Sequence, residues 1–267
     1  MNIKAVFCDI DGTLLNDQHE ITLATKLSIQ NLQKKNIKFV LVSGRSPSGI
    51  YSIIQNNFNH CPIISYNGAI ILDENKKLIY QKGMTHQKAT QIINYIEENN
   101  FDLTWNLFSF DDWITQNRQD PQVQLEEKSL QTFSKEGQIN SLPADQIIHN
   151  ILCMCNPQKI TEIWEKISKK FPDCTVVKSS KTFIDIMVEG VNKAEAVSYL
   201  CKRWNVDVKD AAAFGDNYND CEMLETVGHG IVMGNAPEDI RNRFSEVTLD
   251  NNHDGISVAL KKMKIID

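Results

Sequence analysis

Two aspartates stand one residue apart near the start of the chain, within "FCDIDGTL" at residues 7–14. They follow an apolar run, residues 3–8, that is typical of a buried strand. Because a strand alternates its faces, Asp9 and Asp11 are expected to point the same way at its end. Neighbouring carboxylates repel each other and are costly to bury. The pair therefore leads us to expect a bound cation.

Further polar residues follow other predicted strands. Ser43 and Gly44 come directly after an apolar run at residues 38–42. The segment "GDNYND", residues 215–220, follows the short run "AAAF", and Lys193 opens a predicted helix. An open parallel sheet binds its ligands at the carboxyl ends of its strands. We expect these segments to bring carboxylates, a hydroxyl, backbone amides and an ammonium to one edge.

These residue types favour phosphoryl transfer assisted by a hard cation. An oxygen-only ligand set without Cys or His favours Mg²⁺ over zinc or copper. Ser43, the Gly44 amide and Lys193 supply donors and a positive charge that suit a phosphate dianion. One carboxylate can attack phosphorus, and another can donate a proton to the leaving oxygen and later take one from water.

Strands and helices alternate in both outer thirds of the chain, which predicts an α/β fold with a doubly wound parallel, Rossmann-like sheet. Ser46 and Pro47 together predict the start of a helix. In the first third we expect strands at 3–8, 38–42 and 62–68, helices at 22–35 and after Ser46, and a hairpin over 69–81. In the last third we expect helices at 193–204, 220–227, 237–244 and 255–263, and strands at 211–214, 230–233 and 246–249.

The middle of the chain has a different pattern of predicted elements from the outer thirds, and this pattern predicts an inserted α+β domain. We expect a core domain formed by 1–83 and 187–267, with a cap domain over 84–186. The polar stretch 117–146 is given no helix or strand. Large aromatic residues in this part either fill the cap core, the commoner fate, or line a substrate pocket. They are Trp105, Phe108, Phe110 and Trp113.

Composition narrows the function classes. The 267 residues carry a net charge of −6 with a pI near 5.6, which argues against nucleic acid or an anionic membrane as the main partner. No apolar run approaches the roughly 20 residues of a membrane span, and no signal segment is recognisable. Seven scattered cysteines favour buried thiols in a reducing compartment, so a cytoplasmic protein is expected. The oligomeric state stays open.

Four motifs in order resemble those of the haloacid dehalogenase (HAD) superfamily. They are "DIDGTL" at 9–14, the apolar run into Ser43, Lys193 after "EGVN", and "GDNYND" at 215–220. "PIISYNGA", "GIVMGNA" and "NNHDGISVAL" are similar to the Cof-type subfamily (HAD-IIB), whose C2B-type α/β cap lies between motifs two and three. The resemblance covers both outer thirds, and the cap matches by length and position.

The resemblance implies a role for each matched acid. Asp9 would be the nucleophile and a Mg²⁺ ligand. Asp11 would be the general acid and base, with its backbone carbonyl on the metal. Asp216 would complete the metal site, and Asp220 would brace it from behind.

It also implies a phosphate site. Ser43 and Lys193 would hold the transferring phosphoryl group together with the Gly44 amide, and Asn219 would contact phosphate. The residues themselves leave other uses open, because Lys193 could be a solvated helix residue and Asn219 could cap a helix. Arg45, next to this site, could reach the cap or substrate, or pair with an acid.

The function implied is a Mg²⁺-dependent phosphatase. It would hydrolyse small phosphorylated metabolites, sugar phosphates first, through an aspartyl-phosphate intermediate. A phosphomutase of the same superfamily would return the phosphoryl group to a bound sugar instead of water. A non-catalytic sensor of phosphorylated metabolites is the alternative from another class, although it has no evident need of a nucleophile.

Overall fold

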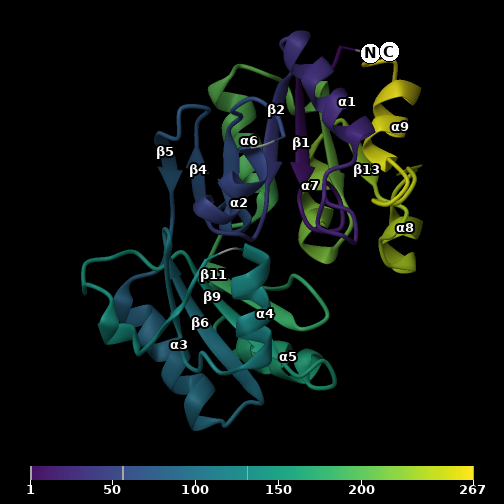
Figure 1. Cartoon of the computed structure of the whole chain (residues 1–267). Helices are drawn as coiled ribbons and strands as arrows, with labels where there is room; N and C mark the ends of the chain where they lie inside the picture. The colour runs from purple at the N-terminus through teal and green to yellow at the C-terminus, as the bar shows by residue number, and fades with distance from the viewer. Residues whose placement is uncertain (1, 56, 131, 267) are drawn as a thin grey trace.

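The strands form two sheets, one built from both outer parts of the chain and one from the middle (Figure 1). The computed structural model describes residues 2–55, 57–130 and 132–266. The larger sheet comprises β1 (Ala5–Asp9), β2 (Lys38–Val42), β3 (Ile63–Ser65), β4 (Ile70–Leu72), β5 (Leu78–Gln81), β12 (Ala211–Gly215), β13 (His229–Val232) and β14 (Glu246–Val247).

Strand β1 lies at the centre of the larger sheet and pairs in parallel with β2 and β12. The full order is β14-β13-β12-β1-β2-β3-β4-β5, with β4 and β5 antiparallel at one edge. Adjacent parallel strands end together, so the residues after β1, β2 and β12 meet at one edge of the sheet.

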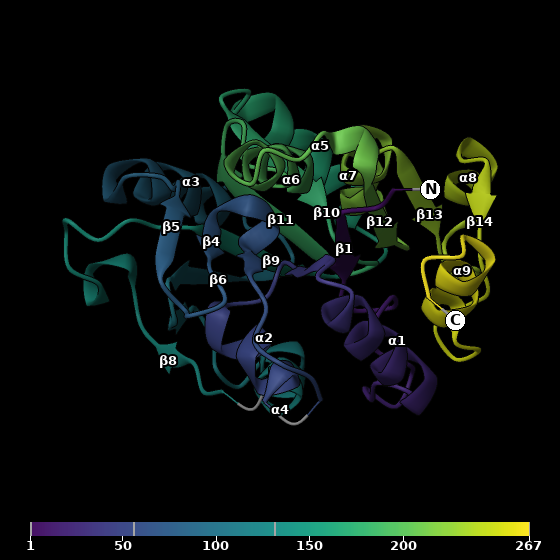
Figure 2. The same cartoon turned by 90° about the horizontal axis from the view of Figure 1, so that it is seen from above.

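Helices cover both faces of this sheet (Figure 2). One face carries α1 (Leu23–Lys34), α2 (Pro47–Ile54) and α9 (Gly255–Lys262), and the other carries α6 (Lys193–Arg203), α7 (Cys221–Thr226) and α8 (Glu238–Arg243). Strand alternation explains the two layers, since Val6 and Cys8 pack in the first cluster whereas Ala5 and Phe7 pack in the second. The predicted doubly wound α/β fold is confirmed.

Local capping sets where the site-bearing helices begin. The Ser46 hydroxyl accepts from the Gly49 amide and Pro47 occupies the first turn of α2, as predicted. The Asn192 side chain accepts from the Glu195 amide at the start of α6. This cap makes Lys193 the first residue of its helix, at the sheet edge where β1 ends.

The smaller sheet has the order β10-β11-β9-β6-β7-β8 and is antiparallel except for the β7–β8 pair. Its strands are β6 (Leu103–Ser109), β7 (Asp112–Thr115), β8 (Lys135–Glu136), β9 (Asn150–Cys155), β10 (Cys174–Lys178) and β11 (Phe183–Val188). Helices α3 (His86–Glu98) and α5 (Ile160–Lys170) cover one face. The other face meets α4 (Pro121–Leu130) and the strand ends of the larger sheet (Figure 1).

The polar stretch 117–146, to which the sequence interpretation assigned no helix or strand, contains α4 and β8. Asp120 followed by Pro121 is the same kind of start signal as Ser46 followed by Pro47, and the Asp120 carboxylate accepts from the Gln122 amide.

Strand β11 runs to Val188, two residues past the predicted boundary at 186. In the described part of the chain no helix is long and apolar enough to cross a membrane.

The four aromatic residues divide between the two possible uses. Trp105 packs under α3 and α5, and Trp113 is buried on the opposite side of the sheet. Phe108 is buried too and also lines the cavity described below. Phe110 lies in the turn after β6, where its carbonyl accepts from the Tyr66 hydroxyl of the larger unit.

Candidate active site

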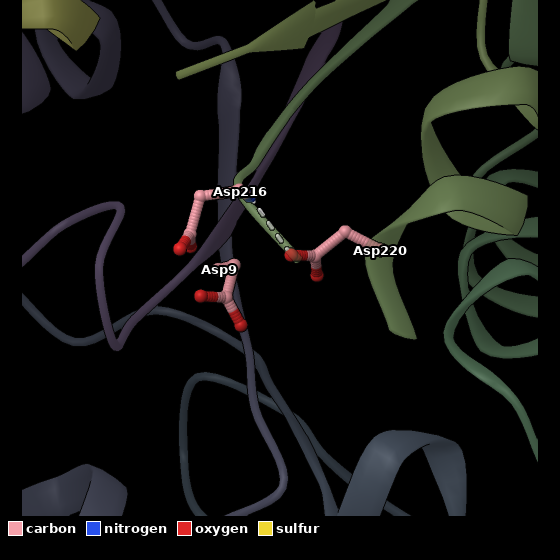
Figure 3. A group of neighbouring side chains, drawn as sticks. All are labelled: Asp9, Asp216 and Asp220. Carbon is pink, nitrogen blue, oxygen red and sulfur yellow. Dashed lines mark hydrogen bonds between the residues drawn. The ribbon is translucent and has the colours of Figure 1, made fainter. Parts of the chain in front are cut away.

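Three carboxylates meet where β1 and β12 end. Asp9 is the last residue of β1, Asp216 follows β12, and Asp220 closes the short turn before α7. One carboxylate oxygen from each lies within 4.8 Å of the others (Figure 3). Sequence motifs more than 200 residues apart are therefore joined at one point, because β1 and β12 are adjacent strands.

Lys193 neutralises part of this cluster from a fully buried position. Its Nζ donates to Asp9 Oδ1 at 2.5 Å and to Asp220 Oδ1 at 2.6 Å, and the residue is only 1% exposed. The other oxygen of Asp220 accepts from the amides of Asp216 and Asn217 at 2.9 Å. Asp220 is thus occupied on both oxygens, while Asp9 shares only one with Lys193.

Asp216 is held against the turn that follows β1. The Thr13 hydroxyl donates to Asp216 Oδ1 at 2.7 Å. Gly12 has φ of +82°, and a β-carbon there would lie 2.4 Å from Asp216 Oδ2. Only glycine meets both conditions, so its small size lets the backbone approach the carboxylate.

The electrostatics of the cluster fit a divalent cation. Burial, reinforced by the charge of Asp220, raises the pKa of Asp9 well above its usual range. The same causes raise the pKa of Asp216 to about 7. Three carboxylates face one ammonium, and a hard oxygen-rich donor set of this kind suits a metal such as Mg²⁺. Asp9 and Asp216 are the side chains best placed to hold it, because Asp220 is already occupied.

Asp11 turns away from the cluster. Strand β1 ends at Asp9, so the alternation expected to align the two aspartates stops before Asp11. Both Asp11 oxygens accept from Arg45, at 2.8 Å from Nε and 2.6 Å from a terminal nitrogen. The Arg45 side chain is 9% exposed and that of Asp11 50%. Of the two uses left open for Arg45, the structure shows pairing with an acid.

Ser43, Gly44 and Asn219 lie around the same opening. Ser43 is buried, and its hydroxyl accepts from the Arg45 amide at 3.1 Å. The Asn219 amide donates to Asn67 Oδ1 at 3.0 Å. Asn67 adopts φ of +53°, directly after Tyr66 at +49°, and its Nδ2 is a buried donor without a partner among the described residues. Strained backbone and an unused donor at one residue are typical of a binding site.

A cavity of about 260 Å³ lies between the two sheets at this point. Five residues predicted from the sequence line it: Asp9, Asp11, Ser43, Gly44 and Asn219. Lys193, Asp216 and Asp220 belong to the cluster joined to it through Asp9. The structure therefore brings together all eight predicted residues.

Comparison with known proteins decides the family. The model of the haloacid dehalogenase-like hydrolases matches residues 6–260 of the chain. The chain belongs to this family.

Several relatives of this hydrolase match it along nearly the whole length. A protein of Haemophilus influenzae is 32% identical over 266 residues, covering 98% of each chain. Phosphatase YwpJ of Bacillus subtilis is 28% identical, covering 98% of this chain and 100% of its own. A haloacid dehalogenase-like hydrolase of Bacteroides thetaiotaomicron superposes with a TM-score of 0.84 at 26% identity, covering 98% of this chain and 99% of that one.

The subclass IIB sugar phosphatase BT4131 shares the fold of this hydrolase, with a TM-score of 0.84 over 98% of this chain and 100% of that one. Its identity is 21%. The predicted membership of the superfamily and its Cof-type branch is confirmed, and so is the prediction of an enzyme of the hydrolase class. The predicted phosphatase activity agrees with the names of these relatives.

The sequence interpretation missed the wall that the smaller sheet contributes to the cavity of this hydrolase. Glu126 comes from α4, which went unrecognised, and Asn150 and Asp185 come from β9 and β11. A signal for the last two was present, because each is a polar residue within an otherwise apolar strand. Asn67 was also missed, although Asn67-Gly68 is a turn signal after an apolar run.

Proposed function

We propose that this hydrolase is a Mg²⁺-dependent phosphatase that hydrolyses small phosphorylated metabolites through an aspartyl-phosphate intermediate. The observation that carries the proposal is the buried Asp9 carboxylate, which accepts a hydrogen bond from Lys193 on one oxygen and lines the cavity between the two sheets. The phosphatase names of YwpJ and BT4131 support it, and BT4131 supports sugar phosphates as the first candidates.

Asp9, Asp216 and the backbone carbonyl of Asp11 would hold Mg²⁺. When bound, the cation supplies positive charge that offsets the carboxylates and the phosphoryl oxygens. Lys193 fixes the orientation of Asp9 and lowers the repulsion that this carboxylate offers to a phosphate dianion. Asp220 braces Lys193 and the amides of 216 and 217, so the ammonium cannot swing away.

The phosphate site is proposed to consist of neutral donors and Lys193. The Ser43 hydroxyl, the Gly44 amide and the Asn219 amide surround the cavity beside Asp9. The unpartnered Nδ2 of Asn67 supports an anion nearby, since Asn67 packs against Gly44 and bonds Asn219. Fixed donors of this kind stabilise charge without reorganising during the reaction.

The reaction then takes two steps. One carboxylate oxygen of Asp9 attacks phosphorus, and the bond from phosphorus to the leaving oxygen breaks while Asp11 donates a proton to that oxygen. Water next attacks the aspartyl phosphate, Asp11 takes the proton from this water, and inorganic phosphate leaves with Asp9 restored. Arg45 holds both Asp11 oxygens in the structure, so one of them has to be released and take up a proton from solvent before the first step. The proton that Asp11 takes from water in the second step returns to solvent when the ion pair forms again.

The smaller sheet with its helices is proposed to act as a cap, residues 84–186, on a core formed by 1–83 and 187–267. It closes the cavity over the strand ends, which would exclude bulk water from the aspartyl phosphate. Each of the seven cysteines is a free thiol, which supports the proposal of a reducing, cytoplasmic setting.

The test is phosphate release from a panel of phosphorylated metabolites, in Mg²⁺ and in EDTA. We expect turnover in Mg²⁺, its loss in EDTA, and a fall of at least about 10⁴-fold for Asp9→Asn, as for other nucleophiles. Asp145→Asn, at an exposed acid of the cap, is the matched control.

Unchanged activity of Asp9→Asn would overturn the covalent mechanism, and full activity in EDTA would overturn the metal assignment. Turnover that needs a bisphosphate activator and releases little phosphate would identify a phosphomutase instead. Binding without any turnover would identify a sensor.

A further inference from the structure

The cap side of the cavity is built by two strands that turn polar residues toward the core. In β9 and β11, Ile151, Ile184 and Ile186 pack under α3 and α5. Side chains alternate along a strand, so Asn150 and Asp185 face the other way, toward the cavity. Asp185 pairs in register with Leu152, which makes Asn150 its diagonal neighbour on the same face.

Asn150 offers an acceptor that nothing in the described chain satisfies. The residue is 1% exposed, and its Nδ2 donates to Asp185 Oδ1 at 2.5 Å. Because a carboxylate accepts and does not donate when ionised, this bond fixes the amide with its oxygen turned away from Asp185. Asn150 Oδ1 is buried without a partner. Leaving such a group buried without a hydrogen bond destabilises the fold unless a donor reaches it.

Two carboxylates line the same cavity as this acceptor, and no lysine or arginine of the described cap residues lines it with them. Asp185 is 3% exposed, and burial raises its pKa. Burial also raises the pKa of Glu126, on α4, to about 7, and Arg45 only partly offsets this. Among the described residues that line the cavity, Arg45 is the only lysine or arginine, and Asp11 engages it with both oxygens.

The cap side thus presents hydrogen-bond acceptors and two buried acids, while the core side presents donors for the phosphate. Resting on the proposed phosphatase, we infer that the leaving group is a compact alcohol bearing hydroxyl or ammonium donors and no second negative charge. Asn150 Oδ1, Asp185 and Glu126 take those donors. A second phosphate or a carboxylate would be buried beside two acids, and the one arginine among the described lining residues is already paired with Asp11, so its burial would be costly.

Matched substrates separate charge from size. We would measure kcat/KM in Mg²⁺ for glucose 6-phosphate, glucosamine 6-phosphate and 6-phosphogluconate, and for glycerol 3-phosphate against 3-phosphoglycerate. The neutral or ammonium-bearing member of each set is expected to exceed the carboxylate member at least tenfold. Equal values, or a preference for the acids, would overturn the inference.

Variants locate the discrimination on the cap. Glu126→Gln and Asp185→Asn keep the shape of the side chain and remove its charge, so each is expected to shrink the neutral-to-acid ratio at least threefold. Glu165→Gln, at an exposed acid on α5, should leave the ratio unchanged. Thermal unfolding identifies a variant that fails to fold, in which case Glu126→Gln, on the helix rather than in the sheet, decides. An unchanged ratio in a folded Glu126→Gln variant would remove Glu126 from the recognition surface.

p-Nitrophenyl phosphate, included in the same assay, distinguishes failure of this inference from failure of the proposed phosphatase activity. Its Mg²⁺-dependent hydrolysis together with a preference for acidic leaving groups would overturn the inference and leave the phosphatase standing. No phosphate from any substrate would overturn both.

Discussion

Each of the two walls of the cavity contains a buried asparagine with one unpaired side-chain atom, and the unpaired atom is a donor on one wall and an acceptor on the other. On the core wall, Asn67 leaves a buried N–H donor without a partner, next to the site proposed for phosphate. On the cap wall, Asn150 leaves a buried oxygen acceptor without a partner, next to two carboxylates. The core wall therefore suits an anion, and the cap wall suits donors.

The walls differ also in how completely their charges are paired. On the core side Lys193 bonds two carboxylates and is 1% exposed. On the cap side Asp185 is hydrogen-bonded by neutral groups, the side chains of Asn150 and Ser179. Because the charges of the core wall are paired within the protein, this wall can bind the phosphoryl group, which is the same in every substrate. The acceptors of the cap wall are unpaired until a leaving group binds, so this wall is where we expect substrates to be discriminated.

Removing Lys193 should have the largest effect on stability and turnover, because it removes the cation that pairs the carboxylates of the core wall. Lys193→Met leaves Asp9 and Asp220 buried without their shared cation, and loss of one partner from a buried ion pair costs about 3–5 kcal/mol. We expect this loss in the free energy of unfolding, measured with urea in EDTA, together with loss of turnover. Lys202→Met, exposed on the same helix, is the control. A loss below 1 kcal/mol in the free energy of unfolding would show that the ion pairs of Lys193 do not stabilise the fold.

Acidic pH should lower the free energy of unfolding through His149, which lies on the cap side. This residue is 3% exposed, its Nδ1 accepts from the Phe110 amide, and burial lowers its pKa from 6.5 to about 4. The unfolded chain takes up the proton first, so the contribution is complete above pH 6.5 and is lost as the pH falls toward 4. With one pKa unit worth about 1.4 kcal/mol, the loss reaches about 3 kcal/mol.

The measurement is urea unfolding across this pH range for the wild type and His149→Gln. The difference between the two should change by most of that amount between pH 7 and pH 4. His60→Gln, at an exposed histidine, should track the wild type. Parallel pH profiles for the wild type and His149→Gln would contradict the prediction.

Mg²⁺ should stabilise the core wall by a somewhat smaller amount. A ligand at 100 times its Kd stabilises the folded state by about 2.7 kcal/mol, which corresponds to roughly 5–10 °C in Tm for a chain of this size. Calorimetry with and without Mg²⁺ should show this rise in the wild type and in Asp145→Asn, and lose it in Asp216→Asn. An equal rise in Asp216→Asn would place the cation elsewhere.

The smallest expected effect tests whether the Asn67 amide binds the substrate phosphate or whether Asn67 only provides the left-handed backbone conformation at this position. Its left-handed backbone suits glycine, so Asn67→Gly should be at least about 1 kcal/mol more stable than Asn67→Ala. Both remove the amide and should lower kcat/KM about tenfold, the equivalent of one hydrogen bond. Full activity in Asn67→Gly would assign Asn67 a purely conformational role.

The sequence was most informative where a residue directly follows an apolar strand. Asp9, Ser43 and Asp216 were placed correctly at one edge because parallel strands end together. The direction of Asp11 was not predictable in this way, because it depends on β1 ending at Asp9 and on an arginine 34 residues away.

The cap wall was harder because it depends on non-local register. Asn150 and Asp185 meet only through the pairing of β9 with β11, which no local pattern specifies. Helix α4 was hidden because its apolar periodicity is broken, with Leu125 being 68% exposed although Val123 is buried. Its start signal at Asp120 and Pro121 was available, so Glu126 could have been placed on a helix.

The Arg45–Asp11 pair has a consequence for timing. In the structure, both oxygens of the proposed proton carrier are occupied by one guanidinium. Asp11 is the more exposed partner, and exposed side chains rotate within picoseconds to nanoseconds, whereas a typical enzyme turns over about ten times per second. Freeing Asp11 from Arg45 would therefore not limit the rate of turnover.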